Sequence, residues 1–342
     1  MKKSEILKPL KLVKRALARD DVVPIFKCLM FDGGRVSAYN DRIGISVPCK
    51  MPDAFGVNGR TFMGILESMS DDIKISILPE SVQLKAGKSV FNMPYFGPED
   101  FIFERPIIEN GVTYTLPSVV PLQACLTTAS NDASQAAIAG VTFVPGYMYS
   151  CDGDTLTRAK LDGVASEPTQ VTVPSEFCEV VISTYSDMGH TGPIEIKTGG
   201  GWAATEIGEC EIFGRLLDVT NPVDFGDLVE KSLPEGWAGL LKSVPEGFDD
   251  ALSRAIILTS TETSPTTLTA DGSQVTFKTK NFLGEITDTV KFDHKPVDAT
   301  VSPVAIQPPL QKCSQFAITE RCCIFVKDKE LLIIVGNLEG ND

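Results

Sequence analysis

The chain offers few side chains that chemistry could use as acids, bases or nucleophiles. It contains two histidines, His190 and His294, and each lies in a loop with Gly or Pro, where we expect a surface position. The run Asp152-Gly153-Asp154 resembles the start of a calcium loop, but the later ligands of such a loop are missing, which favours a turn between paired strands. Glu176 and Glu179 share one face of a predicted helix, which we interpret as a solvated acidic face. Phosphate-loop, nucleophile-elbow and metalloprotease motifs are absent from the sequence, so it predicts no enzyme, no cofactor and no metal site.

The nine cysteines also argue against metal or disulfide chemistry. Their number is odd, and they form no Cys-x-x-Cys pair. Most lie inside apolar runs such as Arg321-Cys-Cys-Ile-Phe325, where a free thiol behaves as a small hydrophobic group. We therefore expect unpaired thiols in a reducing cytoplasm.

The best candidate for binding chemistry is a one-sided cluster of basic residues near the N-terminus. Residues 6–19 predict a helix in which Leu10, Val13 and Leu17 form an apolar stripe. The other face carries Lys8, Lys11, Lys14, Arg15 and Arg19, with no acid between positions 6 and 19. Most charge runs are ordinary solvated faces. This one is segregated within an acidic chain, and such a face would hold phosphates without reading bases.

The overall charge limits which partners that face can have. The net charge is −14, but residues 1–108 carry 16 Lys and Arg against 13 Asp and Glu, whereas residues 109–230 carry 4 against 17. An acidic total argues against tight, static nucleic-acid binding. It is compatible with an acidic outside and a mildly basic inner face.

These residues are positioned by an order of elements that recurs three times. Leu116-Pro117 recurs 117 residues later as Leu233-Pro234, and the run 34–41 is echoed at 146–153 and more faintly at 272–279. Such a period has the size of a domain and predicts three: residues 1–108, 109–230 and 231–342. Each copy alternates helices with strands joined as hairpins, so we predict an α+β fold with two helices packed on antiparallel sheets in each domain. No apolar run is long enough to span a membrane.

The third copy gives the least regular pattern. We expect its first helix at residues 236–244, a strand at 255–260 and a short second helix at 310–316. Its hairpin is expected at 274–280 with 284–291, and its last strands at 322–327 and 330–335.

Several stretches resemble the bacterial DNA polymerase III β sliding clamp. They are Leu7-Lys-Pro-Leu-Lys-Leu-Val13, Val23-Pro-Ile-Phe26 and Phe91-Asn-Met-Pro-Tyr-Phe-Gly-Pro-Glu-Asp-Phe101, together with the threefold order along the whole chain. The resemblance implies half of a six-domain ring, a head-to-tail homodimer with helices inward, which encircles duplex DNA and tethers a polymerase. The divergent copies and the polar tail resemble a bacteriophage-encoded version, which would act in the host cytoplasm.

The resemblance also implies three sets of site residues. The DNA-contacting inner face would comprise Lys8, Lys11, Lys14, Arg15, Arg19, Arg60, Lys242 and Lys312. The pocket for short peptides of the polymerase and the clamp loader would comprise Ile138, Cys151, Gly153, Leu156, Pro234, Val335 and Leu338. The dimer interface would pair Phe91 and Met93 of one chain with Ile257 and Leu258 in the third domain of the neighbouring chain. All four residues also fit an intradomain core.

Two features depart from the family. The predicted helices of the second copy carry no Lys or Arg, and Asp154 stands where the family usually has a basic residue or His. Two other functions therefore stay open: a β-rich phage structural protein, and a decoy that binds the host clamp loader or polymerase. A structural protein has no reason to segregate its basic residues onto one helix face.

Overall fold

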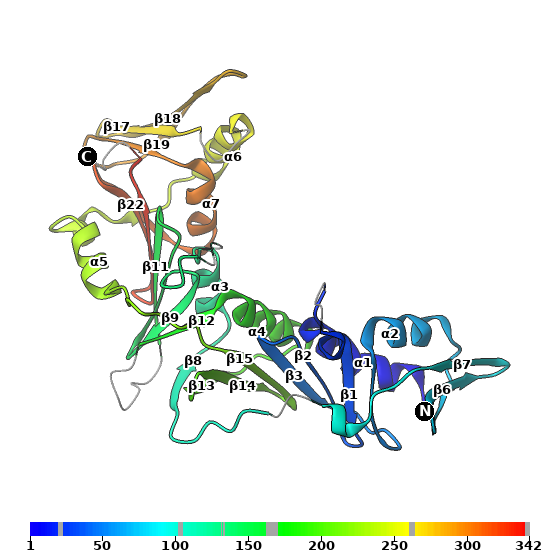
Figure 1. The fold of residues 1–342 in the computed structure, drawn as a ribbon. Coiled ribbons are helices and arrows are strands. Elements are labelled where there is room, and N and C mark those ends of the chain that lie inside the picture. The colour runs from blue at the N-terminus through cyan, green and yellow to red at the C-terminus, as the bar shows by residue number, and fades with distance from the viewer. Residues whose placement is uncertain are drawn as a thin grey trace. The chain divides into compact units, whose positions relative to one another are not determined.

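The computed structural model describes residues 1–19, 23–101, 105–130, 132, 134–161, 170–259 and 264–338 (Figure 1). The chain forms two compact units. Unit 1 comprises residues 1–119 and 176–216, and unit 2 comprises residues 120–175 and 217–342. Both units combine α-helices with antiparallel sheets, so the predicted α+β class is confirmed.

The structure reveals a repeat half as long as the one visible in the sequence. Six α-helices of the described chain are each followed by at least three strands, and in four cases by a fourth. These helices are α1 (Lys3–Val13), α2 (Gly59–Ser68), α3 (Val120–Leu126), α4 (Ser175–Asp187), α6 (Phe248–Leu258) and α7 (Pro303–Lys312). A further helix, α5 (Phe225–Ser232), lies outside the repeat. None of the helices in the described residues is long and apolar enough to cross a membrane.

The strands of unit 1 form two antiparallel sheets. One has eight strands in the order β4-β1-β2-β3-β15-β14-β13-β8, and the other has three in the order β5-β6-β7. Their bounds are β1 (Cys28–Asp32), β2 (Arg35–Tyr39), β3 (Ile43–Pro48), β4 (Ala54–Asn58), β5 (Lys74–Leu78), β6 (Ser81–Ala86), β7 (Ser89–Met93), β8 (Val112–Leu116), β13 (Ile194–Gly199), β14 (Trp202–Ile207) and β15 (Cys210–Arg215).

Unit 2 repeats this plan. Its eight-stranded sheet has the order β12-β9-β10-β11-β23-β22-β21-β16, and its four-stranded sheet the order β19-β18-β17-β20. The bounds are β9 (Gly140–Val144), β10 (Tyr147–Cys151), β11 (Thr155–Lys160), β12 (Val171–Pro174), β16 (Lys242–Ser243), β17 (Thr266–Ala270), β18 (Gln274–Asn281), β19 (Gly284–Lys291), β20 (Val297–Val301), β21 (Gln315–Ile318), β22 (Cys322–Lys327) and β23 (Leu331–Gly336).

Both eight-stranded sheets are joined across the domain boundaries that the sequence predicts. In unit 1, β3 pairs with β15, and in unit 2, β11 pairs with β23. Strands from one predicted domain therefore complete the sheet of the next. The boundaries near residues 108 and 230 accordingly stay a prediction.

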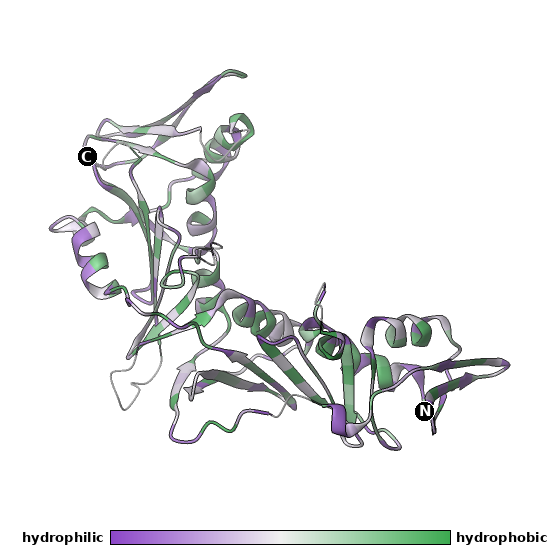
Figure 2. Ribbon diagram, viewed as in Figure 1, coloured by the Kyte–Doolittle hydropathy of each residue, from purple (hydrophilic) through white to green (hydrophobic). Residues whose placement is uncertain are grey.

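Aromatic side chains fix the helices on the sheets. In unit 1, Phe62 of α2 packs against Phe31, with 5.7 Å between the ring centroids. In unit 2, Phe248 of α6 makes edge contacts with Phe277 and Phe316, at centroid distances of 4.7 and 4.9 Å. Figure 2 shows hydrophobic residues along the strands and the helix faces that cover them, as burial of apolar surface requires.

The third copy departs most from the sequence prediction. Residues 255–258 belong to helix α6 and form no strand, and residues 236–244 contain only the 3₁₀ turn Trp237–Leu240 and the short strand β16. The helix expected at 310–316 runs from Pro303 to Lys312. Short side strands such as β4, β8, β17 and β20 were not anticipated either.

Candidate functional site

Five of the eight predicted inner-face residues line one hollow in unit 1. It lies beside the end of α1 and the start of α2 and has a volume of about 620 Å³. The five are Lys11, Lys14, Arg15, Arg19 and Arg60. The one acid in the lining is Glu67. We call this the basic hollow; its contact with DNA stays a prediction.

Local structure explains why these cations gather. Helix α1 buries Ile6, Leu10 and Val13 and exposes Lys11 on its other side. The chain then continues as a 3₁₀ turn, Lys14–Ala16, which carries two further cations. Helix α2 begins where the Asn58 side chain accepts a hydrogen bond from the Thr61 N–H at 3.0 Å, so that Arg60 falls in its first turn. The positive end of the α2 dipole adds to the attraction for an anion.

A second hollow in unit 1 has a mixed charge. Its volume is about 770 Å³, and it shares Arg15, Leu17 and Arg19 with the basic hollow. Its other lining residues include Arg42 and two acids of helix α4, Glu176 and Glu179. We call it the mixed hollow.

The acids of α4 interact with the neighbouring polar groups. Asp187 forms an ion pair with Arg15, and Glu176 accepts a hydrogen bond from the Asn40 side chain at 3.3 Å. The other terminal nitrogen of Arg15, Nη1, is buried and has no hydrogen-bond partner within the described part of the chain. The expectation of a purely solvated acidic face on α4 is therefore wrong for Glu176, which is half-buried and hydrogen-bonded.

The other three predicted inner-face residues lie elsewhere. Lys8 is exposed on α1 but does not line the basic hollow. Lys242 was placed on a helix, whereas it lies on the edge strand β16, where its Nζ is 4.0 Å from a carboxylate oxygen of Asp293. Lys312 ends α7, and its Nζ donates a hydrogen bond to the Thr127 hydroxyl at 3.0 Å. Burial lowers the pKa of Lys312, which makes it a weaker phosphate contact than an exposed lysine.

Unit 2 contains a groove of different character, with a volume of about 470 Å³. Its apolar lining includes Cys151, Leu156, Leu228, Ile334 and Leu338, and its charged lining Asp154, Lys231 and Arg321. Four residues of the predicted peptide pocket, Cys151, Gly153, Leu156 and Leu338, therefore line one groove. We call it the apolar groove.

Three other predicted pocket residues do not line this groove. Ile138 packs at the edge of the hydrophobic cluster that contains Cys151 and Leu156. Val335 is buried on β23, but successive side chains of a strand point to opposite faces, and its neighbour Ile334 reaches the groove. The Pro234 carbonyl accepts a hydrogen bond from the Trp237 N–H at 3.2 Å, which starts the turn that follows α5.

Helix α5 supplies the groove residues that the sequence analysis missed, among them Leu228 and Lys231. It packs on the face of the sheet opposite to α3 and α7 (Figure 1), where Phe225 stacks on Tyr149 at a centroid distance of 5.4 Å. A local signal was present, because the Asp224 side chain caps the helix by accepting a hydrogen bond from the Asp227 N–H at 3.0 Å. The repeat pattern does not predict this helix, because α5 lies outside the repeat.

The predicted interface residues lie on the outer strand β7 and at the end of helix α6. Phe91 and Met93 are on β7, the last strand of its sheet, and Phe91 is 37% exposed. Met93 is buried within its own unit. Ile257 and Leu258 end helix α6, so the expected strand is wrong there, yet Ile257 is 76% exposed.

The histidines and cysteines have structural surroundings. His190 lies in the turn after α4 with its ring against Tyr185. His294 is buried, which contradicts the expected surface position: its Nδ1 donates to the Lys295 carbonyl at 2.9 Å, and its Nε2 accepts from the Ile318 N–H at 3.3 Å. The nine cysteines are buried free thiols, as predicted. Burial raises the pKa of Cys28 and of Cys49 to about 11.

Comparison with solved structures identifies the architecture. A putative DNA polymerase III β subunit from Eubacterium rectale matches with a TM-score of 0.85 at 14% identity, over 99% of this chain and 98% of that chain. The β subunit from Pseudomonas aeruginosa gives 0.84 at 18% identity, over 99% of each chain. The Helicobacter pylori β clamp, solved with a DNA ligase peptide, gives 0.82 at 16% identity, over 99% of this chain and 98% of that chain. The chain has the sliding-clamp fold.

The sliding-clamp fold confirms the resemblance that the sequence suggested. No family model and no curated protein matches the sequence, so the likeness lies in the structure. At 14–18% identity, what is shared is the arrangement of the elements over nearly the whole chain. The exposed residues of the two hollows and the groove are free to differ, and the role of each has to be argued from this chain's own contacts.

Proposed function

We propose that this chain is a DNA sliding clamp, in which two copies close head to tail into a ring around duplex DNA and tether a polymerase. The observation that carries the proposal is the basic hollow, where four cations predicted from one helix face come together with Arg60 of α2 on the sliding-clamp fold. Each copy would contribute three of the six domains, 1–108, 109–230 and 231–342. The chain would serve as an accessory factor rather than an enzyme.

The charge distribution supports sliding contact. Lys11, Lys14 and Arg60 are exposed, and within the described chain none of them forms an ion pair, so all three are available to phosphates. Such contacts lack base specificity and weaken steeply with salt. The chain as a whole carries −14, which would repel DNA from the remaining surface.

We further propose that the apolar groove of unit 2 takes short peptides from the DNA polymerase and the clamp loader. The H. pylori clamp was solved with a DNA ligase peptide, which supports the proposal that this chain also binds a peptide. The groove offers an apolar floor and charged walls, the combination that orients a linear peptide. With these partners, the protein would act in the cytoplasm, where DNA is replicated.

A combined mass and topology measurement tests the proposal. Light scattering should give a dimer, and incubation with nicked circular DNA and a clamp loader should leave protein on the circles that is lost after linearisation. A stable monomer, or equal retention on circles and linear DNA, would contradict the clamp. Assembly into larger particles would favour a structural protein, and loader binding without DNA retention would favour a decoy.

A further inference from the structure

The order of the strands shows which edges remain for contact with another molecule. In each of the six repeats, the third strand after the helix is the outer one of its three strands. Two pairs of these third strands are hydrogen-bonded to each other within the chain: β3 with β15, and β11 with β23. Of the six third strands in the described chain, this leaves β7 and β19 at the outer edge of their sheets. Unpaired edges invite antiparallel addition of another strand. The fold therefore offers β7 of one copy to β19 of a second.

The internal repeat also predicts the register of that pairing. Hairpin β2–β3 has five residue pairs, beginning with Arg35↔Pro48, and hairpin β18–β19 has eight, beginning with Gln274↔Lys291. When the first pairs are superposed, Ile286 takes the place of Ile43, which lies opposite Gly214 of β15. Cys210 of β15 and Ser89 of β7 are equivalent, because each directly follows the two-residue turn before its strand. Gly214 lies as many residues after Cys210 as Met93 lies after Ser89, so Gly214 corresponds to Met93. Ile286 of one copy would thus lie opposite Met93 of the other.

This register carries the tip of the longer hairpin beyond the end of β7. The three extra pairs of β18–β19 are Thr279↔Ile286, Lys280↔Glu285 and Asn281↔Gly284, followed by the tip residues Phe282 and Leu283. Hairpin β10–β11 has five pairs, like β2–β3, so the extension is specific to this hairpin. The tip would reach the residues that follow Met93.

A mainly apolar groove lies at that place in unit 1. Its volume is about 390 Å³, the space of roughly a dozen waters, which suits one or two large side chains. The apolar part of its lining comprises Pro24, Cys28, Phe91, Met93, Pro94 and Phe96. We call it the β7 groove.

The hairpin tip is shaped as a partner for such a groove. Phe282 is 87% exposed and Leu283 is 58% exposed, and Figure 2 shows the hydrophobic end of this hairpin. The Asn281 side chain donates to the Leu258 carbonyl at the end of α6 and accepts from the Leu283 N–H at 2.8 Å. The tip is therefore held in place before any contact forms, which reduces the entropy lost on binding.

We propose that Phe282 and Leu283 seat in the β7 groove of a second copy of this chain when β19 pairs with β7. The inference rests on the proposed dimeric ring and adds to it an apolar anchor outside the expected interface residues. Because the tip and the groove lie on different units, each ring would contain two such contacts, one at each junction.

Covalent capture tests the register. The double variant Pro94→Cys/Leu283→Cys, treated with a short bismaleimide, should give a crosslinked dimer on a denaturing gel. Each single cysteine variant is the control, and the nine native thiols are buried, which limits background reaction. If the double variant gives no more dimer than the single variants, the proposed contact is wrong.

Truncation tests how much the anchor contributes. Phe282→Ala/Leu283→Ala removes side chains that are mostly exposed, so the fold should persist, whereas the dimer should dissociate on the order of a hundredfold more readily, as for an interface hot spot. The matched control is Ile107→Ala, which trims another exposed apolar residue, 85% accessible, away from both surfaces. Thr61→Trp, which fills the β7 groove from its rim, should weaken the dimer as well. A dimeric wild type whose variants dissociate unchanged would overturn this inference alone, whereas a monomeric wild type would overturn the proposed ring.

Discussion

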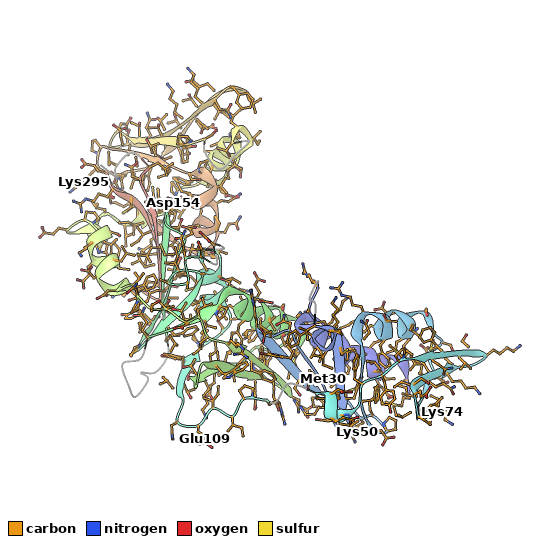
Figure 3. All side chains as sticks on the ribbon, viewed as in Figure 1. Met30, Lys50, Lys74, Glu109, Asp154 and Lys295 are labelled. Carbon is orange, nitrogen blue, oxygen red and sulfur yellow. The ribbon has the colours of Figure 1, made fainter. Side chains whose placement is uncertain are left out.

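The basic hollow of unit 1 and the apolar groove of unit 2 have linings that suit opposite kinds of ligand. The hollow gathers five cations and one acid, so an anion placed there would be held mainly by charge. The groove has an apolar floor formed by residues such as Leu156 and Ile334, with Asp154, Lys231 and Arg321 around it. Figure 3 labels Asp154, at the turn between β10 and β11. One site suits a uniform polyanion, and the other suits a ligand with a particular sequence.

The difference teaches how one chain can hold one partner loosely and another selectively. Charge contacts with phosphates are lost as salt rises and carry no sequence information. Apolar burial is nearly insensitive to salt and depends on the shape of the side chain. Salt is therefore the condition that separates the two sites.

Charge reversal in the basic hollow should have the largest effect. Lys11→Glu/Lys14→Glu/Arg60→Glu replaces three exposed cations in one lining. We expect the affinity for a short duplex to fall by more than about a hundredfold at 0.1 M salt, and the log–log salt slope to become shallower by about 3, because three phosphate contacts are lost. Fluorescence anisotropy over a salt series measures both quantities, and peptide binding should be unchanged.

The matched control reverses the same number of charges elsewhere in unit 1. Lys50, Lys74 and Lys197 are exposed, and none of them lines the basic hollow; Figure 3 labels Lys50 and Lys74. Lys50→Glu/Lys74→Glu/Lys197→Glu should weaken duplex binding only about as much as the change in net charge requires. Equal losses in the two triple variants would show that net charge, rather than the hollow, governs binding.

Truncation in the apolar groove should have the next largest effect, and on the other partner. Leu228→Ala/Leu338→Ala removes two partly exposed side chains from the lining, so the fold should tolerate it. We expect binding of the H. pylori DNA ligase peptide to weaken by about tenfold to thirtyfold, as for the loss of two buried leucine contacts. The loss should be the same at low and at high salt, and duplex binding should not change.

Fluorescence polarisation with the labelled peptide measures this effect. Ile107→Ala/Val304→Ala, which trims two exposed apolar residues outside the groove, is the control. A loss that disappears at high salt would mean that Lys231 and Arg321 hold the peptide by charge, and the contrast between the two sites would then collapse.

The two sites also differ in how well the sequence predicts them. The helix predicted over residues 6–19 ends at Val13, and Lys14 and Arg15 follow on a 3₁₀ turn. The cations of this segment nevertheless lie close together in the sequence, which is a local property, so their clustering could be anticipated. The apolar groove depends on the non-local pairing of β11 with β23 and on a helix outside the repeat, which no local pattern reveals. Leu228 and Arg321 were missed for that reason.

Helix α6 shows the same limit within one element. Residues 255–258, Ala-Ile-Ile-Leu, favour a strand by their composition. The buried positions Phe248, Ala251, Leu252 and Ala255 nevertheless follow a helical period, and their packing on β18 and β19 decides the outcome. Tertiary contact here outweighs β propensity, and it places Ile257 at the end of a helix.

The smallest predicted effect concerns the acids beside the basic hollow. Glu176 and Glu179 line the mixed hollow, and Asp187 pairs with Arg15, so these acids compete with phosphate for the shared arginines. Glu176→Gln/Glu179→Gln/Asp187→Asn should therefore strengthen duplex binding by about threefold to tenfold and steepen its salt dependence by about one phosphate contact, the one that Arg15 regains. The control, Glu109→Gln/Glu195→Gln/Glu206→Gln, makes the same change in net charge at exposed positions outside both hollows. If both variants bind equally well, the α4 acids act only through net charge. If only the first binds more tightly, the α4 acids lower the affinity of the basic hollow for DNA. Such a lowered affinity is what the proposed sliding along the duplex would require.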